Sequence, residues 1–220
     1  CIPHWTFKNK ISKNYLIKDF KSFGGKMIQN YQKKIQLNKT QYLQKIIKGQ
    51  HISIQFLSKD LNVKILSICK QCFRKNHCNP FIIESIISKK FNKRIINKFY
   101  QICLKISRLY DLNGINNLDV VLEFKTKKLF VIELNARPGL STNMIYSTHR
   151  EIFKKRFKIE KYKNPKYHYG THIIYSNKKI ILDKKKFNYI KNFEFNNNFS
   201  ELPDANVIIE KDEPICLVHS

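Results

Sequence analysis

Acidic residues are scarce in this chain. Its 220 residues include 16 Asp and Glu against 42 Lys and Arg, for a formal net charge of +26. Hydrophobic residues make up 42% and aromatic residues 13%, which excludes a disordered polycation and predicts a globular protein with one core or two small ones. The excess of Lys accompanies many Ile and Asn residues. It has two explanations: compositional drift in an AT-rich genome, or an anionic partner such as a nucleic acid.

Long apolar runs are missing as well. No stretch approaches the roughly 18 consecutive apolar residues of a membrane-spanning helix, and no charged-then-apolar leader precedes a small-residue cleavage site. We therefore expect a soluble, cytoplasmic protein without a membrane partner. The chain begins at Cys1 rather than at Met, so we expect that it is processed or that an N-terminal portion is missing.

The six cysteines show no disulfide framework, and reduced thiols are the expectation. Cys69, Cys72, His77 and Cys78 have the ligand types of a zinc site, with one Cys-x2-Cys spacing. Cys69, however, falls on the apolar phase of a strand-like run, and the pair at 77 and 78 lacks the usual spacing of a second zinc knuckle. Unliganded thiols are therefore favoured over zinc.

Alternating apolar residues predict strands in the first third of the chain. Two strands flank a Gly24-Gly25 turn, another covers residues 42–47, and residues 51–56 and 63–68 form a hairpin. From residue 82 to 109 the apolar residues recur at helical spacing, which predicts two helices or one helix broken near Asn92.

The last part of the sequence is predicted to be rich in strands. Residues 118–124 and 129–134 form an antiparallel hairpin. Residues 171–176 and 179–182 form a second hairpin, and residues 206–209 pair with 215–219. The fold class expected from these elements is α+β.

The positions of the few acidic residues indicate a candidate functional site. Asp119 lies within an apolar strand, and Glu133 ends the next one. Alternation places Glu133 and Asn135 on one face, and the short turn returns that face towards Asp119. Such an oxygen-only set suits Mg²⁺ bound together with phosphates, and Arg137 would present its guanidinium to a carboxylate or phosphate there. The alternative is that these are ordinary strand-end acids paired with lysines.

The Gly-Gly turn has two interpretations. Its backbone amides would close over a polyphosphate, to which Lys18 donates as a point charge, or it is a plain hairpin turn. The order of lysine strand, glycine loop, hinge segment and acidic hairpin favours the nucleotide site.

Residues 15–141 resemble the ATP-grasp superfamily. The string Glu-Leu-Asn-Ala-Arg-Pro-Gly at 133–139 is similar to its Glu-x-Asn-x-Arg signature, and Asp119 stands where the family has its first metal-binding acid. Residues 15–18 with Phe23-Gly24-Gly25-Lys26 resemble the ATP-binding lysine and the glycine-rich flap.

Residues 43–49 resemble the hinge that lines adenine, with Gln44 where the family usually has Glu. Ser53 stands where relatives such as biotin carboxylase carry an acid. Residues 169–175 and 202–218 resemble the C-terminal β segment of a branch of ATP-dependent carboligases that are carboxylate-amine ligase-like.

The resemblance implies an ATP-grasp fold, in which two α+β subdomains clasp ATP. Residues 1–150 would form this domain, with a nucleotide-flap part at 1–58 and a metal-site part at 59–150. A basic linker would span 151–168, and a small C-terminal β appendage 169–220. The family's preceding α/β domain would be missing from this chain or supplied by a partner subunit.

The resemblance also implies an ATP-dependent ligase that joins a small-molecule carboxylate to an amine or other nucleophile through an acyl phosphate. Arg137 would be catalytic. Mg²⁺, or Mn²⁺ in its place, would bind Asp119, Glu133 and Asn135. ATP would bind Lys18, Gly24, Gly25, Lys26, Gln44, Ile46 and Ile47.

Two other functions remain open from the sequence. A nucleic-acid-binding module would use the basic stretch 154–167 and its interleaved aromatic residues, although a solvated linker is favoured there and a nucleic-acid partner is not expected. A decayed ATP-grasp protein would bind nucleotide without turnover, as Gln44 and Ser53 suggest.

Overall fold

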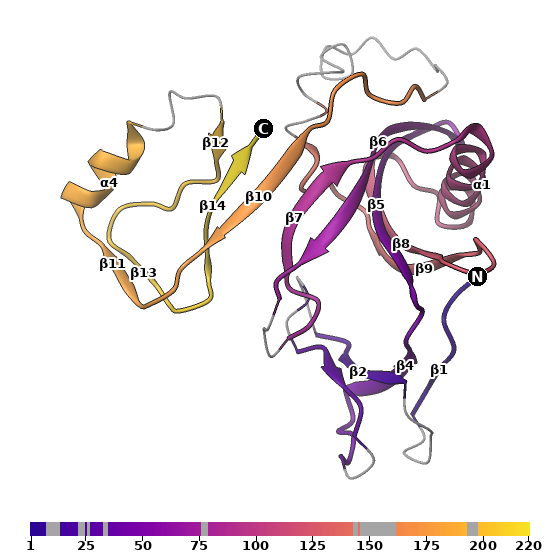
Figure 1. Ribbon diagram of the computed structural model, residues 1–220, viewed down its shortest axis with the longest axis horizontal. Helices are drawn as coiled ribbons and strands as arrows, with labels where there is room; N and C mark the ends of the chain where they lie inside the picture. Colours follow the sequence, from indigo (N-terminus) through magenta and orange to yellow (C-terminus); the bar gives the residue numbers. More distant parts are fainter. Residues whose placement is uncertain are drawn as a thin grey trace.

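The strands of the computed structural model fall into a large, a small and a two-stranded sheet (Figure 1). The structure describes residues 1–7, 14–21, 25, 27–32, 35–75, 79–142, 145, 162–192 and 198–220. The large sheet has the strand order β12-β14-β10-β7-β6-β5-β8-β9. Its strands are β5 (Gly49–Lys59), β6 (Asn62–Phe73), β7 (Ile83–Ser88), β8 (Gly114–Glu123), β9 (Leu129–Asn135), β10 (Gly170–Tyr175), β12 (Phe199–Ser200) and β14 (Pro214–His219).

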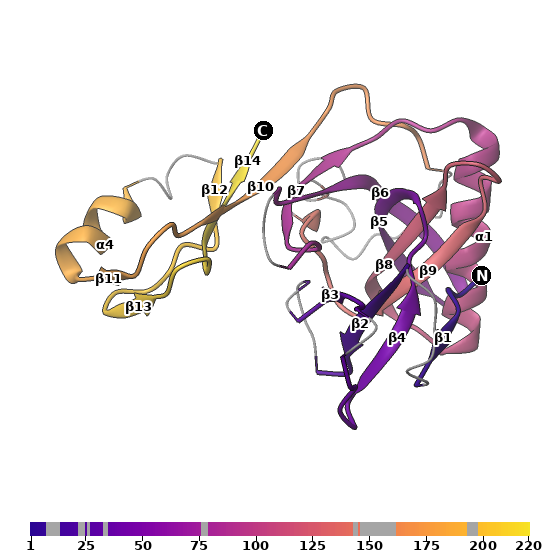
Figure 2. The same ribbon diagram turned by 60° about the horizontal axis from the view of Figure 1, so that its bottom comes forward.

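The small sheet contains the N-terminal strands in the order β1-β4-β2-β3. These are β1 (Trp5–Thr6), β2 (Tyr15–Asp19), β3 (Gln29–Asn30) and β4 (Gln41–Lys45). Ile17, Leu43 and Tyr31 pack on one of its faces as a separate small core. Residues 46–48 lead from β4 directly into β5 of the large sheet, so the two sheets meet at this short connection (Figure 2).

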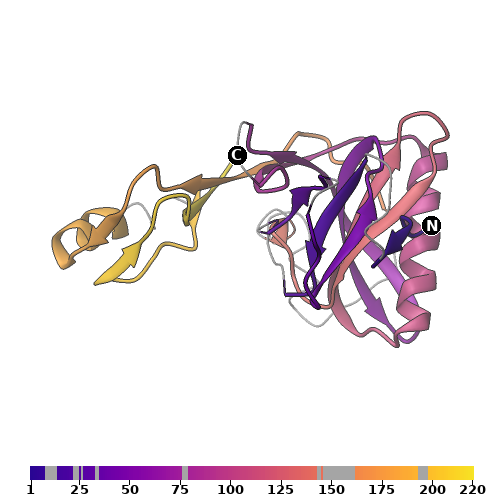
Figure 3. The same cartoon turned by 90° about the horizontal axis from the view of Figure 1, so that it is seen from below.

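One face of the large sheet is covered by helix α1 (Lys93–Leu109), as seen from below in Figure 3. The Asn92 side chain caps the helix by accepting a hydrogen bond of 3.0 Å from the Ile95 N–H. Phe99 and Cys103 are fully buried against the sheet, and the core includes Ile52, Ile54, Phe56, Leu118 and Val120. Among the described residues, no helix is long and apolar enough to cross a membrane.

The other face of the large sheet is polar. Because side chains alternate along a strand, the residues between the core positions point away from α1. Ser53 and Gln55 of β5 and Asn117 of β8 are buried there, and half-buried Asp119 lies beside them. The sheet thus separates a hydrophobic core from a polar surface on which a site can form.

A β-bulge in β9 sets the orientation of the acidic residues. Asp119 is opposite Glu133, but the next residue, Val120, is opposite Val131, which leaves Ile132 as an extra residue. Val131 and Leu134 therefore both pack against the core around α1, although they are three positions apart. Glu133 is exposed on the opposite side.

Most of the predicted strand pairs are confirmed. The antiparallel pairs β2–β3, β5–β6 and β8–β9 are the hairpins predicted from alternation and turns. The helix prediction for the segment that begins at residue 82 is wrong, because residues 83–88 form β7, which pairs with both β6 and β10. Ile82, Ile83, Ile86 and Ile87 recur at helical spacing although Ile87 is 42% exposed, so the apolar pattern of this strand can be mistaken for a helix.

The predicted C-terminal pairs are also wrong. β10 pairs with β14 rather than with the segment after it, and β11 (Ile180–Leu182) pairs with β13 (Val207–Ile209). The chain thus returns on itself in nested pairs, with helix α4 (Lys184–Lys191) at the far end. The α+β class is confirmed by these elements together with the large sheet and α1.

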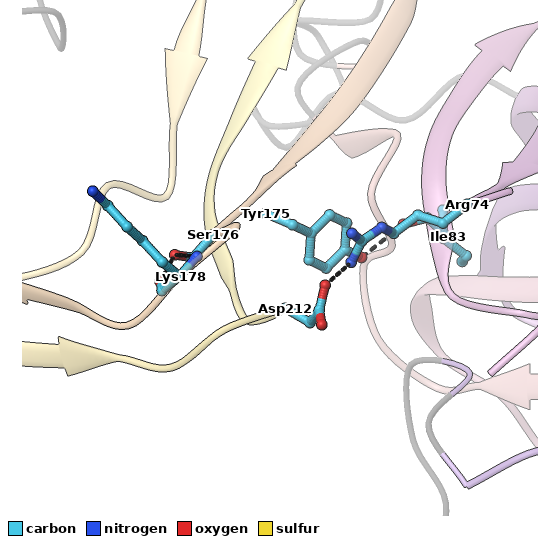
Figure 4. Close-up of polar contacts among 6 residues, drawn as sticks. All are labelled: Arg74, Ile83, Tyr175, Ser176, Lys178 and Asp212. Carbon is cyan, nitrogen blue, oxygen red and sulfur yellow. Dashed lines mark hydrogen bonds and ion pairs between the residues drawn. The ribbon is translucent and has the colours of Figure 1, made fainter. Parts of the chain in front are cut away.

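A cluster of side chains holds this C-terminal part to the large sheet (Figure 4). The Arg74 guanidinium lies 4.7 Å from the centre of the Tyr175 ring, and its Nη1 is 2.9 Å from Asp212 Oδ1. The Tyr175 hydroxyl donates to the Ile83 carbonyl at 2.7 Å. In the same view, the Ser176 hydroxyl donates to the Lys178 carbonyl. Arg74 thus bridges β6 to the strands that extend outward.

Replacing Arg74 by Met should loosen this attachment. The variant keeps the apolar stem but loses the cation over the ring and the ion pair, at a cost of about 1 kcal/mol. The Asp212 N–H, which donates to the Ser176 carbonyl, should then exchange faster with deuterium. The exchange of the α1 amides should not change in this variant. In the control variant Lys70→Met, exchange should be unchanged at both the α1 amides and the Asp212 N–H. Unchanged exchange at Asp212 would contradict the bridging role.

Candidate functional site

Lys18 is a buried cation on β2. Its side chain is 8% exposed, and its Nζ donates to Gln44 Oε1 on β4 at 3.3 Å. Burial lowers the pKa of Lys18, whereas the negative charges of Glu133 and Asp119 raise it. The ammonium group therefore lies within electrostatic reach of both carboxylates, which come from the large sheet.

Asp119 is the most strongly perturbed acid of the site. Burial raises the pKa of its carboxyl to about 6, and the nearby charge of Glu133 adds to this rise. Hydrogen bonds oppose it: Asn117 Nδ2 donates to Asp119 Oδ1 at 3.1 Å, and Ser53 also bonds the carboxyl. The two carboxylates are opposite each other in the β8–β9 ladder, so they repel unless a cation lies between them.

The donor atoms at this position fit a hard divalent cation. Asn135 is opposite Asn117, two residues beyond Glu133 on the same strand. Two carboxylates and an amide oxygen are ligands that Mg²⁺ accepts when phosphates complete its shell. Within the described ranges, no group of three or more His, Cys, Asp or Glu side chains could hold a metal ion. A Mg²⁺ ion at this position would therefore need the Asn135 amide oxygen and phosphate oxygens as further ligands.

The described cysteines form no disulfide bonds. Cys69, Cys72, Cys103 and Cys216 are free thiols, and burial raises the pKa of Cys69 to about 12. His77 and Cys78, the other two candidate zinc ligands, lie outside the described residues.

A cavity of about 60 Å³ lies between the two sheets, beside Lys18. Its lining is Leu16, Lys18, Ile28, Gln44, Lys45, Ile46, Ile47, His51, Phe81, Val121 and Ile132. Apolar walls with a few polar groups are typical of small-ligand sites. The Ile46 N–H, which belongs to one of the two hinge residues predicted to bind ATP, already donates to the Asn14 carbonyl at 2.9 Å.

His51 is a lining residue that the sequence reasoning did not select. Its ring packs edge-on against Phe73, with ring centres 4.9 Å apart. Burial lowers the pKa of His51 to about 4, and the charge of Lys18 contributes. The imidazole is therefore neutral at pH 7. His51 lies two residues before Ser53 in β5, so strand alternation alone could have placed it on the polar face of the sheet.

The low pKa of His51 predicts a loss of stability in acid. As the pH falls below 6.5, the unfolded chain binds a proton that the folded chain accepts only near pH 4. The native state should lose about 2 kcal/mol between these values, after allowance for partial exposure. Urea unfolding at pH 7 and 4.5 should show a smaller loss for His51→Gln than for the wild type. The exposed His172→Gln variant should behave like the wild type, and equal losses in all three would refute this assignment.

A family model described as the ATP-grasp domain matches residues 3–141. This range contains the small sheet, α1 and the strands that carry Lys18, Asp119 and Glu133. The chain belongs to the ATP-grasp family. The match agrees with the resemblance seen in the sequence and with an α+β ATP-grasp fold. No curated protein matches the chain.

Solved structures of other proteins have a similar fold. An N5-carboxyaminoimidazole synthase from Aspergillus clavatus, in complex with ADP and an aminoimidazole ribonucleotide, aligns with a TM-score of 0.69 at 8% identity, over 99% of this chain and 63% of that one. An L-amino acid ligase from Bacillus licheniformis aligns with a TM-score of 0.65 at 15% identity, over 100% and 62%. This chain thus spans about three fifths of these proteins.

Of the residues predicted to form a glycine-rich flap, Gly25 is described by the structure. Gly25 has φ +79°, and a Cβ there would lie 2.0 Å from the Phe81 carbonyl oxygen, so glycine is required by both conformation and space. Phe81 also lines the cavity, which places Gly25 at its edge. Gly24 and Lys26 lie outside the described residues.

Arg137 of the ATP-grasp signature is exposed. Its Nη1 makes a long contact of 3.4 Å with the Pro138 carbonyl. The segment that follows is held by a buried polar network: Gln55 Nε2 donates to Thr142 Oγ1 at 3.2 Å, and Ser141 bonds both Gln55 and Ser67. Gln55 is fully buried, and sequence reasoning did not select it.

Proposed function

We propose that this chain is the nucleotide-binding and catalytic part of an ATP- and Mg²⁺-dependent ligase, which activates a carboxylate as an acyl phosphate for attack by an amine. The supporting observation is the convergence of buried Lys18 with Asp119 and Glu133 beside the cavity. A basic nucleic-acid-binding surface has no need for two facing carboxylates.

The similar structures support the reaction class. One is described as an L-amino acid ligase, and a carboxyaminoimidazole synthetase from Staphylococcus aureus is described as complexed with ADP. At 15% and 11% identity they show a similar fold, and the extension of their chemistry to this chain is part of the proposal.

The proposed reaction has two steps. A carboxylate oxygen of the substrate attacks the γ-phosphorus of ATP, the bond to the β,γ-bridging oxygen breaks, and ADP leaves. The amine nitrogen then attacks the acyl carbon, the carbon–oxygen bond to phosphate breaks, and inorganic phosphate and a proton leave. Such chemistry depends mainly on positioning and on charge neutralisation.

Each residue of the site would have a role that follows from its position. Apolar hinge residues and Gln44 hold the base, and the Lys18 ammonium neutralises phosphate oxygens. Asp119, Glu133 and Asn135 supply oxygen ligands to Mg²⁺, which would offset the phosphate charge when bound. Arg137 would steady the acyl phosphate through its planar guanidinium group.

Thermal unfolding with and without Mg-ATP tests the nucleotide site. A ligand present at 100 times its Kd adds about 2.7 kcal/mol, which for a domain of this size corresponds to a rise of about 5–10 °C. The rise should require Mg²⁺ and should disappear in Glu133→Gln. Glu210→Gln, which changes an exposed acid paired with Lys179, should keep it. If Mg-ATP does not move the wild-type midpoint, the proposed function is wrong.

Turnover is tested by the release of ADP with panels of carboxylates and amines. Release that requires both substrates, and that is lost in Glu133→Gln but not in Glu210→Gln, would support a ligase. Release with water alone, unaffected by any added acid, would argue against it.

A further inference from the structure

Four aromatic side chains gather on the small sheet: Trp5, Phe7, Phe20 and Tyr42, which we call the aromatic cluster. The Phe20 and Tyr42 rings are stacked with centres 5.0 Å apart, and Trp5 meets Phe7 edge-on at 5.4 Å. Phe7 and Phe20 lie 6.3 Å apart, and Trp5 and Tyr42 6.5 Å apart. Trp5, Phe7 and Phe20 are 53%, 55% and 65% exposed, so these large rings form a continuous accessible surface.

The strand register places the aromatic cluster on the ligand side of the sheet. Trp5 is opposite Gln44, and Tyr42 is opposite Lys18. Directly opposite residues lie on the same face, and Gln44 and Lys18 line the cavity. The aromatic cluster is therefore continuous with the candidate site.

The small sheet does not need these rings for its own core. Its core residues Ile17, Leu43 and Tyr31 lie on the other face. The negative charge of Glu133 acts on the Tyr42 hydroxyl, so the inner end of the aromatic cluster is near the acids as well as near Lys18.

We propose that the aromatic cluster binds the organic part of the carboxylate substrate, and that this substrate is an aromatic acid. The inference rests on the proposed function and adds the class of substrate. An acid whose ring contacts Phe20 and Tyr42 would have its carboxylate beside the Lys18 ammonium, because Lys18 is opposite Tyr42. The charges of the two groups are complementary. Stacked and edge-on ring contacts favour an aromatic ring over a saturated one of similar size.

Trp5 is the only tryptophan of the chain, so its fluorescence reports on the aromatic cluster directly. Benzoate and cyclohexanecarboxylate have the same charge and nearly the same size, and they differ in the π-system. Both would be titrated into the full chain in the presence of Mg²⁺ and a non-hydrolysable ATP analogue. We expect benzoate to change the Trp5 emission saturably and to bind about fivefold to tenfold more tightly.

Phe20→Leu should reduce this preference to about twofold or less, and Phe124→Leu should leave it unchanged. Phe124 is 61% exposed and follows β8, so it matches Phe20 in exposure but lies outside the aromatic cluster. Equal affinities for the two acids, the absence of a saturable benzoate signal, or an equal effect of both variants would overturn the inference. A Mg-ATP thermal shift retained in the same sample would show that the proposed function survives that failure.

Discussion

Replacing Phe99 by Ala should destabilise the chain by about 3–5 kcal/mol, the range found for large aromatic truncations in protein cores. Phe99 is fully buried in the core between α1 and the large sheet, and its ring meets Phe91 edge-on at 5.2 Å between centres. The variant would leave a cavity beneath the strands that carry Asp119. Urea unfolding followed by circular dichroism measures the effect.

Leu109→Ala is the matched control for this prediction. Leu109 ends the same helix and is 67% exposed, so its truncation should change the free energy of unfolding by less than about 0.5 kcal/mol. Similar losses for the two variants would mean that α1 does not cover the large sheet in the way described.

Replacing Lys18 by Met should separate stability from nucleotide binding. Burial lowers the pKa of Lys18 despite the two acids nearby, which means that folding disfavours its charge. Without nucleotide, the Met variant should therefore be as stable as the wild type or more so. Its affinity for Mg-ATP should fall by about 10- to 100-fold, because hydrogen bonds from a cation to phosphate oxygens are lost.

Lys70→Met serves as the control, since Lys70 is exposed on β6. Isothermal titration with Mg-ATP, combined with thermal unfolding of the free chains, distinguishes the effects. A Lys18→Met variant that binds Mg-ATP normally would remove Lys18 from the site. One that unfolds readily without nucleotide would show that Lys18 has a structural role.

The β8–β9 hairpin, which carries Asp119 and Glu133, is the part of the site that could be predicted from the sequence. Alternation and a short turn were sufficient to predict that β8 and β9 pair and that Asp119 faces the side of Glu133. Both elements are local, and a hairpin register depends mainly on nearby residues. The lysine strand was predicted for the same reason.

Long-range pairing could not be predicted in this way. β10 joins β7 across more than eighty residues, and β14 closes on β10 rather than on its neighbour in sequence. No local pattern specifies such partners, so the C-terminal hairpins were assigned incorrectly. The roles of His51 and Gln55 depend on what faces them from β6 and from the segment after β9, which a single strand pattern does not contain.

The bulge at Ile132 has a consequence for how this site can change over time. The extra residue shifts the alternation of β9 by one position, so that Val131 and Leu134 both face the helix-covered core while Glu133 between them lies on the other side. Deleting Ile132 would remove the extra residue and leave Glu133 opposite Asp119, whereas deleting Leu134 would turn Asn135 towards α1. Point substitutions can thus vary the chemistry of the site gradually, whereas a change in the length of β9 would disrupt it where it falls between the residues that carry the oxygen ligands.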